Sequence, residues 1–267
     1  MFIKQGQIIT NFAQCPVVDK MEDRWRIYYS YRVDGKSHPT FVDVEPGKPN
    51  KVIYRHLKPI IPLGNNYDCD GVMPTFIMNM NGKKYLYYVG WKIVNDLYEN
   101  CTCLAVGTDC TTKDSEYPKE FIFQKMGPIL QKDSKELFTS TLWVLNNEIG
   151  VYLACHDRDE NETYYDLKFA RHDSGRNWNK LDRFAVKVEG YSVCSYTAVE
   201  GLVMWCQRTN GYRDYVIKGF PFDLQPSKTG WDSEMTAYPY LVEHEGKIFL
   251  FYNGNGFGAT GIGYAIL

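Results

Sequence analysis

The sequence predicts an all-β protein, because short runs of alternating apolar residues recur along the chain and sustained helical patterns are nearly absent. A strand, a polar corner and a second strand form a unit that appears five times. The first strands of these units lie near residues 14–18, 72–77, 139–144, 195–199 and 238–242. Each unit continues into a third strand, and some into a fourth, in the stretches 51–55, 121–125 and 184–188.

Repeated units of four antiparallel strands are typical of propeller blades. The expected fold is therefore a five-bladed β-propeller of four-stranded antiparallel blades, which forms a single domain over residues 1–267. Residues 2–9 precede the first unit, and the last unit ends at Leu267. We expect residues 2–9 to add an outer strand to the last unit, because this pairing closes the ring and removes exposed sheet edges.

Composition and charge exclude several classes of partner. The formal net charge is −2 and no long basic patch occurs, which argues against nucleic acid or an anionic membrane as the main partner. No apolar run is long enough to span a bilayer, and the first residues lack a signal-peptide pattern, so we expect a cytoplasmic protein. The 21 tyrosines suit either a sugar-binding surface or ordinary packing within sheets.

The eight cysteines are expected to be reduced and mostly buried, since most lie inside apolar strand runs. Cys101, Cys103 and Cys110 form a cluster in the sequence, but no second pair of cysteines or histidines accompanies them. That spacing does not favour a zinc site. We therefore expect neither a metal site nor a cofactor.

The innermost strand of a propeller blade starts near the central funnel, so residues around these strand starts are expected to share one pocket. Candidates at the strand starts are Gln14, Asp68, Asp70, Ser195, Asp232, Glu234 and Tyr238. The loops that follow the second strands also overlook the funnel, and they add Arg32, His38, Trp91, His156, Arg208 and Asn253.

Asp70 and Glu234 are the candidate catalytic pair. Cleavage of a glycosidic bond needs one carboxyl group to protonate the leaving oxygen and another to act as base or nucleophile. Apolar neighbours of Glu234 would raise its pKa by desolvation, as an acid catalyst requires. The alternatives are that Asp70 only caps a turn through the backbone and that Glu234 pairs with an arginine in the funnel.

The remaining candidates are interpreted as substrate-binding residues. Arg32, Arg208 and His38 are suited to an anionic group such as a sugar carboxylate or a phosphate, and the alternative is that they are solvated loop charges. Trp91 follows Gly90 at a strand end, where it either stacks on a sugar ring or packs in the core.

Several of these stretches resemble one family. The runs 70–74, 85–91, 231–235 and 252–256 resemble the five-bladed glycosidase-like superfamily of arabinanases, β-xylosidases, invertases and levansucrases. The chain is most similar to small single-domain relatives associated with bacterial surface-polysaccharide biosynthesis. The resemblance implies three funnel carboxylates, of which Asp70 matches one seat. Gln14 and the stretch 139–141 depart from the other two seats.

Residues 172–178 resemble an Asp-box, a hairpin in which Asp and Gly shape a tight turn above a packed Trp. The resemblance implies a structural role for this hairpin and no catalytic one.

These features favour a glycoside hydrolase-like enzyme that acts on a small or nucleotide-activated sugar in bacterial polysaccharide metabolism. The first alternative is a sugar-binding propeller that has lost the chemistry, for which Gln14 is the main evidence. The second is a phosphorolytic or transfer enzyme on glycosides, in which Arg32, Arg208 and His38 would hold phosphate.

Overall fold

A computed structural model describes residues 1–107, 123–159, 162–208 and 214–267. Within these residues the regular structure consists of nineteen strands and one helix of four residues, α1 (Asn255–Gly258). The all-β prediction is therefore confirmed. No helix in this described part of the chain is long and apolar enough to cross a membrane. Cys110, and residues 121–122 of the strand expected at 121–125, lie outside the described residues.

The first sheet contains two antiparallel meanders that a single parallel pairing, Ser37 with Gly71, joins edge to edge. The first meander consists of β2 (Gln14–Lys20), β3 (Trp25–Val33), β4 (Lys36–Glu45) and β5 (Lys48–Arg55). The second consists of β6 (Gly71–Met80), β7 (Lys83–Val94), β8 (Leu97–Gly107) and β9 (Phe123–Leu130).

Three smaller sheets complete the described part of the fold. One consists of β10 (Phe138–Val144), β11 (Ile149–Arg158), β12 (Thr163–His172) and β13 (Trp178–Val186). The next has three strands, β14 (Ser192–Val199), β15 (Leu202–Arg208) and β16 (Val216–Phe220). The last consists of β17 (Ala237–His244), β18 (Lys247–Asn253), β19 (Ile262–Ile266) and β1 (Ile3–Ile9).

The three-stranded sheet corrects the expectation of four strands in every unit. After β16 the chain meets Pro221 and then Pro226, neither of which has a backbone N–H to donate to a sheet. After these prolines begin, the chain pairs with β16 only through an isolated antiparallel bridge between Leu224 and Ile217. Proline therefore prevents a fourth strand from forming here.

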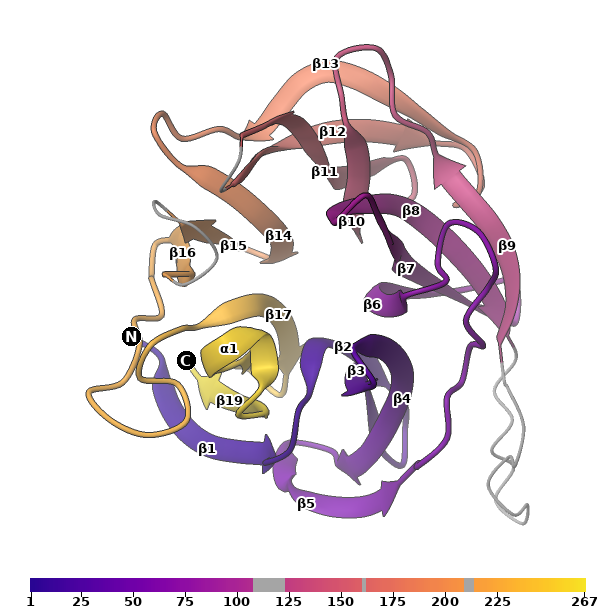
Figure 1. The fold of residues 1–267 in the computed structure, drawn as a ribbon. Coiled ribbons are helices and arrows are strands. Elements are labelled where there is room, and N and C mark those ends of the chain that lie inside the picture. The colour runs from indigo at the N-terminus through magenta and orange to yellow at the C-terminus, as the bar shows by residue number, and fades with distance from the viewer. Residues whose placement is uncertain (108–122, 160–161, 209–213) are drawn as a thin grey trace.

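The sheets stand around a common centre, with β2, β6, β10, β14 and β17 innermost (Figure 1). Residues from all of these strands line one narrow cavity of about 20 Å³. Each inner strand also slips in register against its neighbour, between residues 14 and 17, 74 and 76, 139 and 142, 194 and 196, and 237 and 240. Such bulges bend a strand and turn its side chains. Three residues in these segments, Cys15, Ser195 and Tyr238, have φ values of 58°, 51° and 53°.

The N-terminal strand closes the last sheet, as the sequence predicts. β1 pairs antiparallel with β19, from Ile3 opposite Ile266 to Ile9 opposite Ile262. Aromatic packing continues this closure, because Trp25 of β3 contacts Phe249 of β18 edge to face at 5.1 Å between ring centroids. The first and last units of the chain are thus packed against each other.

The hairpin at 172–178 has the structural role expected for it. Gly175 adopts a φ of 72° at the turn, and its N–H donates to Nδ1 of His172 at 3.0 Å. Trp178 packs under the turn, and its Nε1–H donates to the Gly175 carbonyl at 3.2 Å. Tyr87 of β7 donates to the same carbonyl at 2.7 Å. The hairpin therefore ties the sheet of β10–β13 to β7.

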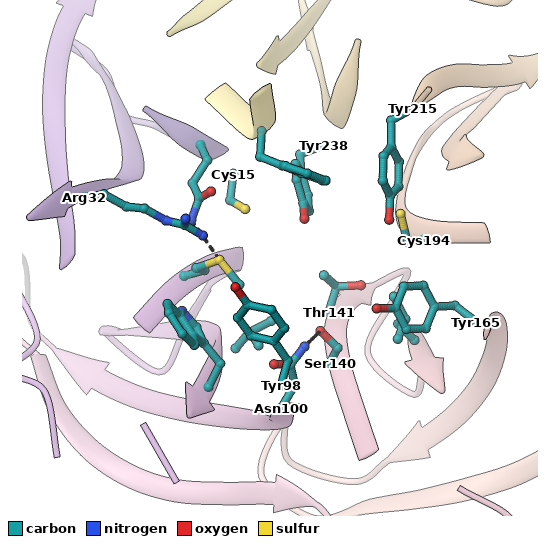
Figure 2. A pocket seen from close by; sticks show the side chains of 16 residues that line it. Cys15, Arg32, Tyr98, Asn100, Ser140, Thr141, Tyr165, Cys194, Tyr215 and Tyr238 are labelled. Carbon is teal, nitrogen blue, oxygen red and sulfur yellow. Dashed lines mark hydrogen bonds between the residues drawn. The ribbon is translucent and has the colours of Figure 1, made fainter. Parts of the chain in front are cut away.

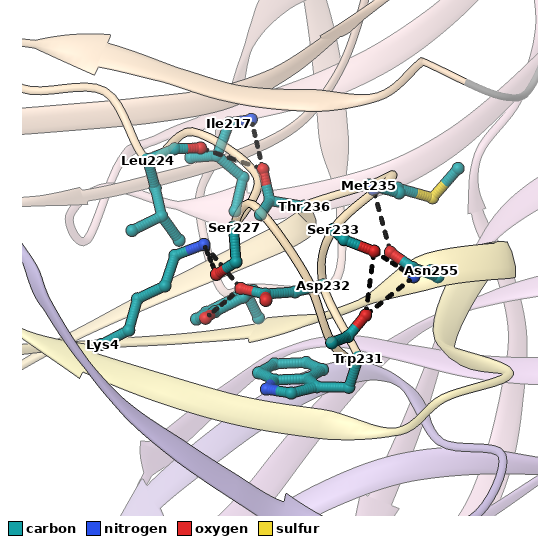
Figure 3. A network of polar contacts seen from close by, with 12 residues as sticks. Lys4, Ile217, Leu224, Ser227, Trp231, Asp232, Ser233, Met235, Thr236 and Asn255 are labelled. Carbon is teal, nitrogen blue, oxygen red and sulfur yellow. Dashed lines mark hydrogen bonds and ion pairs between the residues drawn. The ribbon is translucent and has the colours of Figure 1, made fainter.

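A buried ion pair fixes the N-terminal strand to the loop before β17 (Figure 3). Nζ of Lys4 lies 2.6 Å from Oδ2 of Asp232, whose side chain is 2% exposed. The Tyr252 hydroxyl donates to the same oxygen at 2.9 Å. Asp232 was expected to bind substrate, but these contacts make it a structural residue.

We predict that Asp232→Asn lowers the free energy of unfolding by about 1.5 to 3 kcal/mol, because it weakens two hydrogen bonds to a buried charged group. Urea denaturation measures this loss. Glu45→Gln is the control, since Glu45 pairs with Lys48 and Lys51 at the surface and such pairs contribute little. Equal stability of Asp232→Asn and the wild type would contradict the prediction.

Candidate functional site

A pocket of about 250 Å³ opens where the inner strands converge (Figure 2). Its walls are mainly aromatic and apolar. The rings are those of Trp91, Tyr98, Tyr165, Tyr215, Tyr238 and Phe257, and the other apolar residues are Met73, Val89 and Leu153. The polar lining consists of Gln14, Arg32, Asn100, Ser140 and Thr141, with the thiols of Cys15 and Cys194.

The strand bulges place several of these side chains in the pocket. Cys15 and Tyr238 have left-handed backbone conformations, which residues other than glycine seldom adopt. Neighbouring side chains hold these segments in place. The Cys15 N–H donates to Oδ1 of Asn253 at 3.3 Å, and the Tyr238 N–H donates to Sγ of Cys206 at 2.9 Å. Backbone strain of this kind is often found at functional sites.

Arg32 is the one charged side chain among the described residues that line the pocket, and none of those residues is Asp or Glu. Gln14 stands where the resemblance implies a carboxylate. Its Nε2 donates to Oγ of Ser37 at 3.2 Å and lies 3.0 Å from Sδ of Met73. On another wall, Nδ2 of Asn100 donates to Oγ of Ser140 at 3.3 Å. The polar groups of the lining are thus mainly amides and hydroxyls.

Two thiols, that of Cys15 in the pocket and that of Cys206 beneath it, are poor nucleophiles. Burial raises the pKa of Cys15 far above its ordinary range, and it raises the pKa of Cys206 as well. Because the thiolate is the reactive form, these cysteines remain protonated and unreactive at neutral pH. Burial also raises the pKa values of the Tyr215 and Tyr238 hydroxyls, which therefore remain neutral hydrogen-bonding groups.

Asp70 lies beside the pocket but does not line it. Its Oδ2 accepts a hydrogen bond from the Ile93 N–H at 2.8 Å, and Nζ of Lys36 lies 3.5 Å from Oδ1. The Ile93 hydrogen bond, and then Lys36, hold the pKa of Asp70 below its ordinary value. Asp70 is thus an ionised carboxylate that the neighbouring backbone holds in place.

Glu234 does not occupy the enclosed setting that the sequence analysis expects. Its side chain is exposed and does not line the pocket, while its own N–H donates to Oδ1 of Asn255 at 2.8 Å. The apolar neighbours that were expected to cover it are used elsewhere. Trp231 stacks on Tyr252 at 5.1 Å, Met235 is buried, and Tyr238 faces the pocket.

Two other expected binding residues are buried in structural contacts, as Asp232 is. Asp68 is 1% exposed and lies 2.5 Å from Nζ of Lys125. Asn253 is fully buried and accepts the hydrogen bond from Cys15 described above. Both side chains are buried with their partners, and neither lines the pocket.

The remaining candidates also lie outside the main pocket. Arg208 is 2% exposed, donates to the Thr163 carbonyl, and lies 3.2 Å from Glu162. Its guanidinium packs near the rings of Tyr165 and Tyr215, so it supports the pocket wall from behind.

His156 is exposed and lies 3.1 Å from Asp166, and His38 packs against Tyr31 with ring centroids 5.6 Å apart. Ser195 lines the narrow cavity below the pocket.

The structure thus brings Gln14, Arg32, Trp91 and Tyr238 together in one pocket. Sequence reasoning missed Cys15, Tyr98, Asn100, Thr141, Tyr165, Cys194 and Tyr215 as lining residues. Cys15 and Cys194 lie at strand bulges, and the prolines at 16, 74 and 239 were the available signal for three of these bulges. Among the residues that the structure describes, no three His, Cys, Asp or Glu side chains gather so that they could hold a metal ion.

Comparison with known proteins identifies solved structures that share this fold. No family model matches the chain. An uncharacterized protein of Mycobacterium tuberculosis is 28% identical over 285 residues, which cover 96% of this chain and 92% of that protein. A solved structure described as a glycoside hydrolase superposes with a TM-score of 0.69 at 15% identity, covering 98% of this chain and 90% of that protein.

Two further solved structures have a similar fold. A glycosyl hydrolase from Bacteroides ovatus has a TM-score of 0.65 at 10% identity and covers 96% of this chain and 84% of its own length. A thermostable family-43 glycoside hydrolase has a TM-score of 0.63 at 13% identity, with coverage of 95% and 88%. At these identities the likeness shows the fold, so the chain has a fold that it shares with glycoside hydrolases.

We predict that Asp70→Asn lowers the free energy of unfolding by at most about 1 kcal/mol at pH 7. Because the pKa of Asp70 is lowered in the folded protein, its stabilising effect is present above its ordinary pKa of about 3.9 and is lost as the pH falls through the folded value. Urea denaturation of the wild type and Asp70→Asn at pH 7 and pH 3 should show a difference that shrinks at pH 3. Asp182→Asn, at an exposed position of β13, is the control. If the stability difference between the wild type and Asp70→Asn were larger at pH 3 than at pH 7, this explanation would be wrong.

Proposed function

We propose that this protein binds a carbohydrate in the pocket where its inner strands converge, and that the fold is a single-domain, five-bladed propeller. The lining of the pocket is the observation that carries the proposal. It combines aromatic rings with neutral amides and hydroxyls, and its described residues include no carboxylate. Aromatic faces with a few placed polar groups suit a sugar ring, which has apolar faces and a polar edge.

The blade count is supported by the inner strands. β2, β6, β10, β14 and β17 each carry a register slip, and all of them line the same narrow cavity. One such strand for each antiparallel unit is the arrangement expected of five blades around an axis.

The described lining of the pocket lacks the two acids that hydrolysis requires, which supports sugar binding without hydrolysis. Hydrolysis needs two carboxyl groups about 5 to 9.5 Å apart on either side of the scissile bond. Gln14 is neutral and cannot protonate a leaving oxygen, and the described lining supplies no acid in its place. A pocket of this composition holds a sugar but lacks the proton donor and the base that its cleavage requires.

The size of the pocket favours a small ligand. A cavity of about 250 Å³ lies below the roughly 300 to 1,000 Å³ of pockets that enclose drug-sized molecules. It therefore suits one sugar unit better than a complete nucleotide sugar. We place this role in bacterial polysaccharide metabolism on the resemblance of the sequence, and the match to a mycobacterial protein agrees with a bacterial setting.

Glycosidic hydrolysis or transfer is the second candidate function, and the fold shared with glycoside hydrolases favours it. In this alternative the ionised Asp70 would act as base or nucleophile, and Glu234 as acid. Both would have to approach a ligand from outside the present lining.

We predict that Tyr98→Ala weakens sugar binding about 2- to 13-fold, because stacking on an aromatic ring contributes about 0.5 to 1.5 kcal/mol. Tyr98 lines the pocket and is 45% exposed, so its removal should spare the fold. Thermal-shift screening of sugars, followed by calorimetry on the hits, gives the affinities. Tyr191→Ala is the matched control, since Tyr191 is 42% exposed and does not line the pocket.

A measurement of turnover distinguishes sugar binding from glycosidic hydrolysis or transfer. We expect the wild type to bind a sugar without cleaving nitrophenyl glycosides or the bound sugar. Hydrolysis by the wild type that disappears in Glu234→Gln and Asp70→Asn would establish the second candidate in place of the first.

A further inference from the structure

We infer that the ligand of this pocket is an acidic sugar, whose carboxylate or phosphate group pairs with Arg32. The inference rests on the proposed function, because it specifies the chemical class of the sugar that the same pocket binds. The observations that carry it are the charge of the lining and the setting of the Arg32 guanidinium.

Arg32 has no ion-pair partner among the carboxylates of the described residues. Lys36, on the strand that pairs with that of Arg32, pairs with Asp70 at 3.5 Å, and Lys92, next to Trp91, pairs with Glu99 at 3.4 Å. These two acids are thus already paired with lysines. The Arg32 guanidinium is left with its positive charge directed to the pocket that it lines.

Two aromatic rings hold Arg32 in position. Its guanidinium carbon lies 5.3 Å from the ring centroid of Phe12 and 5.8 Å from that of Trp91. Trp91 is 3% exposed and packs so closely on Gly71 that a Cβ at residue 71 would overlap the indole. Arg32 therefore rests on a rigid surface, and its N–H groups remain available for the paired hydrogen bonds that a carboxylate or phosphate accepts.

The rest of the lining supports an anionic group in preference to a cationic or neutral one. The described lining has no carboxylate that would repel an anion or neutralise Arg32 internally. Ser140 and Thr141 add hydroxyl groups, which donate hydrogen bonds to oxyanions. A hydrogen bond from the charged guanidinium is stronger than one from a neutral group. A neutral sugar would cover the guanidinium without supplying a counter-charge, which is unfavourable.

The test compares three ligands of the same ring: glucose, glucuronic acid and glucose 1-phosphate, by calorimetry at low salt. The wild type should bind at least one of the two acidic sugars about 10- to 100-fold more tightly than glucose, the range expected for hydrogen bonds to a charged group. The better of the two identifies the acidic group as carboxylate or phosphate. Binding of the acidic sugar should weaken as salt is added, because salt screens the pairing.

The variants then assign this preference to Arg32. Arg32→Gln should remove the preference for the acidic sugar by weakening the binding of that sugar, whereas Arg32→Lys should retain part of the preference, because lysine keeps the charge but loses the planar fork. Arg183→Gln is the matched control, since Arg183 is also exposed and lies 5.1 Å from an aromatic ring, that of Phe169, outside the pocket. Circular dichroism and melting temperature verify that each variant is folded.

Two failures can be told apart. Equal affinity of the wild type for glucose and both acidic sugars, or an undiminished preference in folded Arg32→Gln, would overturn the role of Arg32 and leave sugar binding established. The absence of binding for neutral and acidic sugars alike, including oligosaccharides of each kind, would overturn the proposed function and this inference with it.

Discussion

Crowding at the centre is the constraint on which the rest of the structure depends. The five innermost strands leave a gap of only about 20 Å³ between them, so they cannot all continue as regular pleated strands through the point where they meet. Each strand relieves the crowding with a register slip, and three of them place a non-glycine residue at positive φ there. Pro16 and Pro239 fall within two of these slips, where they have no ladder partner, and Pro74 stands at the start of a third, opposite Tyr88. The pocket opens beside this crowded point, and its lining follows from how the strands bend.

Charged residues are divided between the framework and the site. The buried acids Asp232 and Asp68 pair with Lys4 and Lys125, and these pairs hold surrounding segments together. Such pairs are costly to break, because a buried charge would be left without a partner. The acids thus stabilise the framework, while the described lining of the pocket retains a single cation.

This division explains how one fold can serve either catalysis or binding. The arrangement of the sheets sets where a ligand can bind, and the side chains that line that place set which chemistry is possible there. The chain shares its fold with glycoside hydrolases, yet the described lining of its pocket contains no Asp or Glu.

The positions of most strands and their order could be predicted from the sequence. Alternation of apolar residues and polar corners marked the repeated units, and the unpaired residues 2–9 pointed to the strand that closes the last sheet. It also placed Gln14, Arg32, Trp91 and Tyr238 at the pocket. The spacing of residues along the chain was sufficient for this, because strand periodicity is a local property.

Which polar side chains face the pocket depends on contacts between segments that are distant in the sequence. A bulge adds one residue to a strand and changes the direction of its side chains locally. Cys15 lies within such a bulge and Cys194 lies at the start of another, and both line the pocket. The environment of Glu234 depended in turn on Trp231, which stacks on Tyr252 from another strand and leaves the carboxylate in solvent. Burial and pairing arise from segments distant in the chain, and for this reason the sequence could name the candidate acids but could not say which of them a ligand would meet.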